Sequence, residues 1–375
     1  MQTGSKELIR DINKQLVLDI IRQRGPISRA SISKELGLTK ATISAIVQVL
    51  LDHHLVVEVG SDDTKKGRKP ILLQFHKECG YVISIDLSTE YITLMSADLA
   101  GKSCALHRVE NHSDKDTVIP ILTELIQDRI RQLPESIYGP VGISLGIHGV
   151  VCDNLPTFVP YSPYTGMDFA AALEEHFHIP VLLGNEANLA ALGEWTHSYH
   201  SPNMLSISVH SGIGLGIIMN NALICGQNGY AGEFGHSIIS VGGRPCPCGN
   251  YGCLEQYASE RALLKGLSKV KGRKITPDEF AALYQHKDQD ALHTMDDFVT
   301  YMAVGINNLL NTFNPEIIVI NSSFTMNFPE VTKDIHRALE NYMQRYCRIE
   351  PSLLQDIAIL LGGVSVCSRH FLETL

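Results

Sequence analysis

From residue 81 onward, short strand-like segments alternate with helical ones, and this order occurs twice along the chain. The first set begins with three strand-like runs in quick succession, at 81–87, 91–98 and 102–110. Helix and strand then alternate: Val118–Leu133, 141–147, Asp168–Phe177, 181–184 and Ala187–Trp195. Such alternation is typical of a sheet whose faces are covered by helices.

The second set repeats the opening of the first. Hairpin-like strands at 203–209 and 214–224 precede helical segments after Tyr257, and two late strands are expected at 316–320 and 357–363. The repeat predicts an α/β body built from two similar lobes around a cleft.

Ahead of this body, residues 28–53 carry the pattern of two short helices joined by a turn. Ile32 and Leu36 are one helical turn apart, Gly37 breaks the pattern, and Thr39 is a plausible N-cap of the second helix. The apolar face of that helix comprises Ile43, Ile46, Val47, Leu50 and Leu51. A helix over Asn13–Arg24 completes the expected helix-turn-helix core.

A basic loop follows between two strand-like runs, 55–59 and 71–75. We interpret this hairpin as the wing of a DNA-binding winged helix occupying residues 1–78; the alternative is a solvated hairpin beside a helical bundle. The predicted DNA contacts come from the second helix and from the wing: Lys40, Thr42, Ser44, Lys65, Lys66, Arg68 and Lys69.

The charge distribution supports this division. The first 75 residues hold twelve Lys and Arg against eight Asp and Glu, whereas the whole chain has a net charge of −9. A basic head on an acidic body suits a module that binds an anion. The polar start, MQTGSKELIR, and the absence of a run of 18 apolar residues predict a cytoplasmic protein that does not span a membrane.

The stretch 236–253, HSIISVGGRPCPCGNYGC, concentrates one His and three Cys. Disulfides fit poorly with the expected reducing compartment and with an odd total of nine Cys, which leaves a metal site or four unmetallated buried side chains. Four ligands of these types suit tetrahedral Zn²⁺, and a full Cys₃His set leaves no open coordination position. The predicted ligands of a structural zinc ion are His236, Cys246, Cys248 and Cys253.

Four motifs give the chain a resemblance to the ROK family of sugar kinases and sugar-responsive repressors. They are GNEANLAALGEW (184–195), HSGIGLGI (210–217), GEFGH (232–236) and CPCGNYGCLEQYAS (246–259). The resemblance implies an actin-like (ribonuclease H-like), two-lobed domain over 79–375, with lobes at roughly 79–195 plus the C-terminal segment and at 196–355. Within the family, NEAN and GRKP look most like the xylose-repressor branch.

The resemblance also implies a sugar pocket. The zinc-bound His236 would face a sugar hydroxyl, Glu233 and Glu255 would accept hydrogen bonds from others, and Asn185 and Glu186 would form the second half of the site. In ROK kinases the position of Glu186 is an Asp that acts as general base. Because a misplacement of about 1 Å can cost two orders of magnitude in rate, Glu is expected to bind sugar without catalysing phosphorylation.

A sugar kinase is the main alternative, and its phosphate-binding signals are incomplete. Kinases of the family carry Asp-x-Gly-Gly-Thr where this chain has DLSTE (86–90), and glycines where it has NSS (321–323). The glycines of GIGLG (212–216) remain, although glycines also allow tight lobe packing. We therefore expect a defunct nucleotide site and no enzymatic activity.

These features favour a transcriptional repressor of a carbohydrate operon that binds operator DNA and a monosaccharide effector, and the resemblance alone favours xylose as the sugar. It would act as a homodimer or dimer of dimers, and lobe closure would shift two winged helices away from their half-sites. The sugar would either release DNA or strengthen its binding, and the residues do not favour one over the other; release is the family's commoner mode. A regulator that responds to a partner protein is the other alternative.

We expect Trp195 to be a core residue, and His148 is a further candidate for ligand contact.

Overall fold

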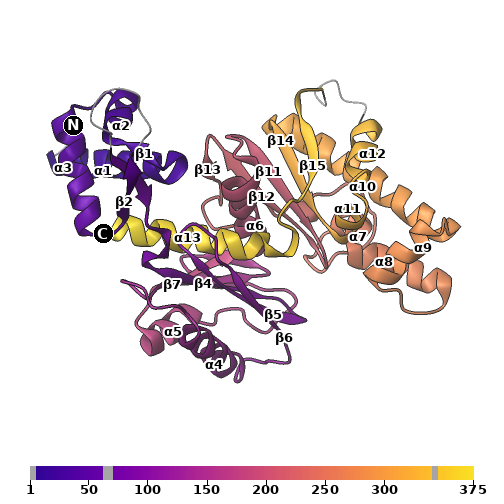
Figure 1. Cartoon of the computed structure of the whole chain (residues 1–375). Helices are drawn as coiled ribbons and strands as arrows, with labels where there is room; N and C mark the ends of the chain where they lie inside the picture. Colours follow the sequence, from indigo (N-terminus) through magenta and orange to yellow (C-terminus); the bar gives the residue numbers. More distant parts are fainter. Residues whose placement is uncertain (1–5, 62–70, 340–344) are drawn as a thin grey trace.

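The computed structural model describes residues 6–61, 71–339 and 345–375. The chain forms a small N-terminal head and a body of two lobes, and the last helix runs from between the lobes to the head (Figure 1). The head contains helices around a sheet of order β1-β3-β2. Its elements are α1 (Lys6–Arg24), β1 (Ile27–Ser28), α2 (Arg29–Leu36), α3 (Lys40–Asp52), β2 (Val56–Ser61) and β3 (Ile71–Phe75).

Local sequence signals set the ends of the two helices in the helix-turn-helix. Ser28 Oγ accepts a hydrogen bond from the Ser31 N–H at 3.1 Å and caps the start of α2, and Gly37, with a φ of +66°, caps its end. Thr39 Oγ1 accepts from the Thr42 N–H at 3.1 Å and begins α3. The predicted winged helix-turn-helix is confirmed, and α1 begins at Lys6 rather than at Asn13.

The first lobe contains a five-stranded sheet of order β10-β7-β4-β5-β6. The strands β4, β7 and β10 are parallel, whereas β5 and β6 continue the sheet in antiparallel fashion. The elements are β4 (Tyr81–Leu87), β5 (Tyr91–Asp98), β6 (Ala105–Glu110), α4 (Val118–Arg131), β7 (Pro140–Ile147), β8 (Val150–Cys152), β9 (Leu155–Phe158), α5 (Phe169–Phe177), β10 (Val181–Asn185) and α6 (Glu186–Glu194).

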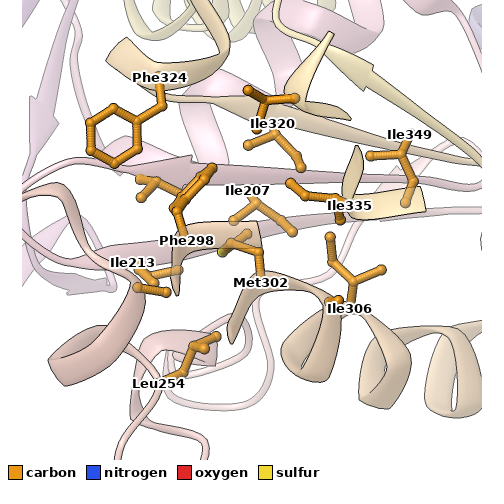
Figure 2. Close-up of a cluster of buried hydrophobic side chains, with 14 of the residues drawn as sticks. Ile207, Ile213, Leu254, Phe298, Met302, Ile306, Ile320, Phe324, Ile335 and Ile349 are labelled. Carbon is orange, nitrogen blue, oxygen red and sulfur yellow. The ribbon is translucent and has the colours of Figure 1, made fainter. Parts of the chain in front are cut away.

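The second lobe repeats this arrangement with a sheet of order β13-β12-β11-β14-β15, antiparallel on one side of β11 and parallel on the other. Its core gathers aliphatic and aromatic side chains between the sheet and α10 (Figure 2). The predicted two-lobed α/β repeat is confirmed. The elements are β11 (Met204–Val209), β12 (Ile213–Met219), β13 (Ala222–Leu223), α7 (Glu255–Ala258), α8 (Glu260–Lys271), α9 (Pro277–Gln285), α10 (Gln289–Phe313), β14 (Ile317–Asn321), α11 (Ser323–Asn327), α12 (Val331–Ala338) and β15 (Arg348–Pro351).

The prediction of a strand at 357–363 is wrong, because this segment lies at the start of helix α13 (Ala358–Thr374). A short apolar run is compatible with either a buried strand or a buried helix, so its composition could not decide. Among the described residues, Gln355–Thr374 is the one helical stretch long and apolar enough to cross a membrane, and 61% of its apolar window is buried inside the protein. It is the core helix between the lobes.

The head and the body share one hydrophobic core. Side chains of α1, α3 and β3 pack in the same cluster as side chains of β4, β5 and α13. Tyr138 adds a polar link, since its hydroxyl donates to the His53 carbonyl at 2.7 Å while its ring meets Phe371 of α13 edge-on. A movement of α13 therefore reaches the head through direct packing. Members of this core include Val17, Leu50, Leu73, Val82, Ala97, Leu361 and Phe371.

Candidate functional site

All five side chains expected to bind sugar line one cavity between the lobes. Asn185 and Glu186 come from the first lobe, at the junction of β10 and α6. Glu233, His236 and Glu255 come from the second lobe, on either side of the Cys-rich loop. Polar groups from both lobes thus converge on one space, as in a small-molecule site that closes around its ligand.

The Cys-rich loop folds back on itself as an irregular hairpin. Isolated antiparallel bridges join Ile238 to Cys253 and Pro245 to Tyr251. Gly252 is required at its position: its φ is +84°, and a methyl group there would lie 1.7 Å from the Ser240 carbonyl oxygen. This fold-back brings the first and last ligands of the predicted metal site together.

The four predicted metal ligands form one cluster. The ligand atoms of His236, Cys246, Cys248 and Cys253 all lie within 4.8 Å of one another. The Sγ atoms of Cys248 and Cys253 are 3.7 Å apart, and Cys246 Sγ is 3.5 Å from His236 Nδ1. Sulfur ligands about 2.3 Å from a tetrahedral zinc ion are separated by roughly 3.8 Å. The donor set and spacing therefore fit a metal ion.

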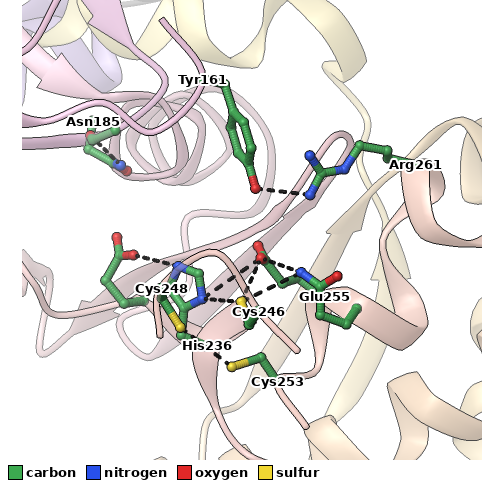
Figure 3. A network of polar contacts seen from close by, with 11 residues as sticks. Tyr161, Asn185, His236, Cys246, Cys248, Cys253, Glu255 and Arg261 are labelled. Atoms are coloured by element: carbon green, nitrogen blue, oxygen red, sulfur yellow. Dashed lines mark hydrogen bonds and ion pairs between the residues drawn. The ribbon is translucent and has the colours of Figure 1, made fainter. Parts of the chain in front are cut away.

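His236 lies between this cluster and the cavity (Figure 3). Its Nδ1 faces Cys246 and lies 3.8 Å from Glu255 Oε1, whereas its Nε2 lies 3.7 Å from Glu233 Oε2. Glu255 is only 4% exposed and accepts hydrogen bonds from the Cys246 thiol at 3.2 Å and from Gln256 at 2.9 Å. The loop thus fixes one imidazole and two carboxylates at one wall of the cavity.

Asn185 and Glu186 are fixed by the start of α6. Asn185 Oδ1 accepts from the N–H groups of Ala187 and Asn188, and its amide donates to the Gly149 carbonyl at 2.9 Å. Burial raises the pKa of Glu186, and the nearby His148 and His210 oppose this shift.

The glycines of the GIGLG segment allow β12 to pack closely on α6. A methyl group on Gly214 would lie 2.8 Å from the Ala187 Cβ, and one on Gly216 would lie 2.3 Å from the Ala191 Cβ. Because this close approach explains both glycines, they provide no separate evidence for phosphate binding.

The His148 imidazole, which lines the cavity, forms an ion pair with Asp86. Its Nε2 lies 2.7 Å from Asp86 Oδ1, with side-chain exposures of 24% and 16% respectively. Burial disfavours the imidazolium, but the Asp86 carboxylate and, to a smaller extent, Glu186 outweigh it and raise the pKa of His148 to about 9. The first acidic residue of DLSTE therefore has a partner within the protein, which the sequence pattern did not indicate.

This ion pair predicts a pH-dependent contribution to stability. Because the folded pKa of about 9 exceeds the unfolded value of 6.5, the contribution is fully present below pH 6.5 and is lost as pH rises through 9. We expect the free energy of unfolding to fall by up to about 3 kcal/mol more in the wild type than in His148→Gln between pH 6.5 and 10. Urea unfolding at several pH values measures this free energy. If it changed equally with pH in the wild type and in His148→Gln, the prediction would be refuted.

The two segments that differ from the kinase motifs, 86–90 and 321–323, both form hydrogen bonds within the protein. Ser88 Oγ accepts from the Tyr91 N–H at 3.0 Å and closes a turn after β4. After β14, the buried Glu260 carboxylate accepts a hydrogen bond from the Ser323 N–H. A carboxylate on this backbone donor would repel a phosphate.

Tyr161 and Arg261 join the two lobes beside the cavity, and sequence reasoning missed both (Figure 3). Arg261 Nη2 donates to the Tyr161 hydroxyl at 2.9 Å, and the guanidinium carbon lies 4.6 Å from the centre of the Tyr161 ring. Tyr161 lines the cavity and Arg261 belongs to α8. No motif marks either residue, because the pairing exists only once the lobes are placed together.

The predicted DNA contacts are only partly described. Lys40 and Ser44 are exposed at the start of α3, whereas Thr42 is half-buried and its hydroxyl lies 2.9 Å from that of Thr39. The four wing residues Lys65, Lys66, Arg68 and Lys69 lie outside the described residues.

Comparisons with known proteins agree with this architecture. The sequence model of the ROK family matches residues 82–367, and a model for winged helix-turn-helix DNA-binding matches residues 10–57. The chain is 36% identical to a xylose repressor of Bacillus spizizenii, over 100% of this chain and 99% of that protein.

Among solved structures, a ROK family transcriptional regulator described as a homologue of the Escherichia coli MLC protein superposes with a TM-score of 0.84 at 25% identity, covering 97% of each chain. A ROK family glucokinase from Streptomyces griseus, in complex with glucose and AMPPNP, superposes with a TM-score of 0.70 at 21% identity, over 77% of this chain and 100% of that one. The comparisons favour a transcriptional regulator over a kinase, since a winged helix-turn-helix DNA-binding model matches residues 10–57 and the full-length relative is named a repressor. The chain belongs to the ROK family, in its branch with an N-terminal winged helix-turn-helix.

Proposed function

We propose that this protein is a sugar-responsive transcriptional repressor of a carbohydrate-utilisation operon. The proposal rests on a cavity between the lobes that is lined by polar side chains. The body that contains this cavity shares a hydrophobic core with the winged helix. The protein acts in the cytoplasm as a homodimer or dimer of dimers, because two heads are needed to read two operator half-sites.

The cavity binds a monosaccharide through fixed donors and acceptors. Glu233 and Glu255 accept hydrogen bonds from hydroxyls, the His236 imidazole contributes its Nε2, and Asn185 and Glu186 hold the opposite side. Xylose is the favoured sugar, because the relative from Bacillus spizizenii is named a xylose repressor.

His236, Cys246, Cys248 and Cys253 hold a zinc ion that serves a structural purpose. When bound, zinc cross-links the hairpin and supplies no open coordination position for chemistry. The cross-link keeps His236, Glu233 and Glu255 at fixed positions, so that the pocket exists before the sugar arrives.

Sugar binding changes the affinity for DNA through movements of α6 and α13. Closure of the lobes on a sugar moves α6, which carries Asn185 and Glu186 at its start, against α13. The far end of α13 packs into the core of the head, so the two heads of a dimer move out of register with their half-sites and release the operator.

Calorimetry with purified protein tests the sugar site. D-Xylose, with glucose and N-acetylglucosamine for comparison, should give a saturable heat with wild type and with Glu110→Gln, whose exposed side chain lies outside the cavity. Glu233→Gln loses the charged acceptor, a cost of about 1.5–3 kcal/mol that corresponds to roughly 10- to 100-fold weaker binding. No heat with any sugar would contradict the proposal, and sugar-dependent ATP consumption at ordinary kinase rates would replace it with a kinase.

Operator binding tests the head. Lys40→Ala removes an exposed cation at the start of α3, and we expect weaker DNA binding whose log–log salt slope falls in magnitude by about 0.9. Lys265→Ala, an exposed cation on α8, should leave both quantities unchanged. Fluorescence anisotropy over a range of salt concentrations measures the slope, and an unchanged slope in Lys40→Ala would remove this residue from the interface.

A further inference from the structure

A second cavity, of about 1000 Å³, lies where the head meets the body, and we call it the joint cavity. The head supplies part of α1 and Phe75, while the body supplies the β5–β6 turn, a π-helical turn at Trp195–Tyr199 and α13 from Val364 to Glu373. Among the described residues, none lines both the sugar cavity and the joint cavity.

Basic side chains reach the joint cavity from three separate elements. Arg22 comes from α1 in the head, Lys102 from the β5–β6 turn and Arg369 from α13. The Arg22 side chain is 29% exposed, and its Nη1 lies 3.7 Å from Asp19 Oδ1, beyond hydrogen-bond distance. Asp19 and Glu373 also line the cavity, so among the described lining residues three permanent cations face two carboxylates.

The electrostatic environment of His197 indicates where the positive potential gathers. Burial, which has the largest effect, and the positive charges of Lys102, His200 and Arg22 together lower the pKa of His197 to about 4. A neutral imidazole surrounded by basic groups is a donor or acceptor beside a region that favours an anion. Its Nε2 lies 3.2 Å from Ser365 Oγ, which also lines the cavity.

The walls of the joint cavity are built by specific local structure. The buried Asp98 holds the β5–β6 turn by accepting from the N–H groups of Ala100 at 3.0 Å and Lys102 at 2.8 Å. In that turn Gly101 has a φ of +68°, and a methyl group there would lie 2.6 Å from the His197 ring. On the other side is a π-helical turn, a feature often found at functional sites, which begins at the half-buried Trp195.

We propose that the joint cavity is a second effector site, which binds an organic phosphate monoester. Arg22, Lys102 and Arg369 would approach the phosphate from three sides, and the indole of Trp195 with the amides of Gln15 and Gln23 would contact the organic part. Because Arg22 belongs to the head and the other two cations to the body, the bound phosphate would tie the two together. Its occupancy would therefore change the affinity for DNA without contact with the sugar cavity.

The single tryptophan of the chain supplies a fluorescence signal beside the joint cavity, and the variants Arg369→Ala and Glu233→Gln separate this cavity from the sugar cavity. Because Trp195 lines the joint cavity, its fluorescence emission reports on this site. We expect ribose 5-phosphate, and more weakly inorganic phosphate, to give a saturable emission change and a matching calorimetric heat at constant ionic strength. Arg369→Ala should weaken binding at least tenfold, whereas Arg337→Ala, an exposed arginine on α12, should leave it unchanged.

Three outcomes would overturn the proposal. The first is the absence of both an emission change and a heat, and the second is equal binding by malonate, which would indicate a general anion site. The third is loss of ribose 5-phosphate binding in Glu233→Gln with no loss in Arg369→Ala, which would place the ligand in the sugar cavity. If Glu233→Gln loses monosaccharide binding but still binds ribose 5-phosphate, the two ligands occupy different sites. The joint-cavity proposal can therefore fail or succeed independently of the sugar site.

Discussion

Cys253→Ser is expected to yield a protein that contains no zinc, unfolds at a lower temperature and no longer binds a monosaccharide. Cys253 is fully buried and is the last of the four clustered ligands. A serine hydroxyl is a poor replacement for a thiolate, and structural zinc contributes on the order of 10–16 kcal/mol to the folding of small zinc peptides. If zinc contributes only a few kcal/mol of this to the free energy of unfolding of the domain, its loss should lower the midpoint of thermal unfolding by about 10 °C.

Cys347→Ser is the matched control, because Cys347 is also a buried thiol but lies outside the cluster. It should lose no zinc and keep sugar binding, although a buried hydroxyl will cost some stability. Elemental analysis, thermal unfolding with and without chelator, and calorimetry measure the three expectations. Wild-type metal content in Cys253→Ser would rule out its role as a ligand, and intact sugar binding in metal-free protein would rule out the zinc-braced pocket.

The sequence predicted those parts of the fold that depend on neighbouring residues. Thr39 and Gly37 mark helix ends through their own hydrogen bonds and backbone angles, so the helix-turn-helix could be found without tertiary information. The metal cluster was equally accessible, because its four ligands lie within one short segment whose glycines permit the turn. The positions of the sugar-site residues came from the resemblance to the ROK family and stay predictions.

The features that could not be predicted depend on contacts between distant segments. Asp86 pairs with His148 only because β4 and β7 are neighbours, and Tyr161 meets Arg261 only because the lobes face each other. The strand β15 was missed because its four residues, RIEP, carry little strand signal without the β14 edge on which they pair. The strand wrongly predicted at 357–363 also reflects tertiary contacts. This part of α13 is buried on all sides, so its sequence lacks the apolar periodicity that identifies a helix.

Gly362→Ala is expected to be strongly destabilising, because α6 and α13 are in backbone contact at this point. A methyl group on Gly362 would lie 1.8 Å from the Leu189 carbonyl oxygen, and one on Gly193 would lie 2.1 Å from the Ala358 carbonyl oxygen. Two helices cannot separate here without opening the core around both sheets, so we expect a cost of about 3 kcal/mol or more. This corresponds to a fall of about 6–10 °C in the midpoint of thermal unfolding.

The same substitution at Gly266, in the middle of α8, is the control. A methyl group there meets nothing within 4 Å, so Gly266→Ala should raise stability by about 0.5–1 kcal/mol through its better helix propensity. Because α6 carries Asn185 and Glu186 and α13 reaches the head, we also expect Gly362→Ala to weaken the effect of sugar on DNA binding. Equal thermal midpoints for the two variants would show that the α6–α13 crossing has room to relax, and would remove it as the path from cavity to head.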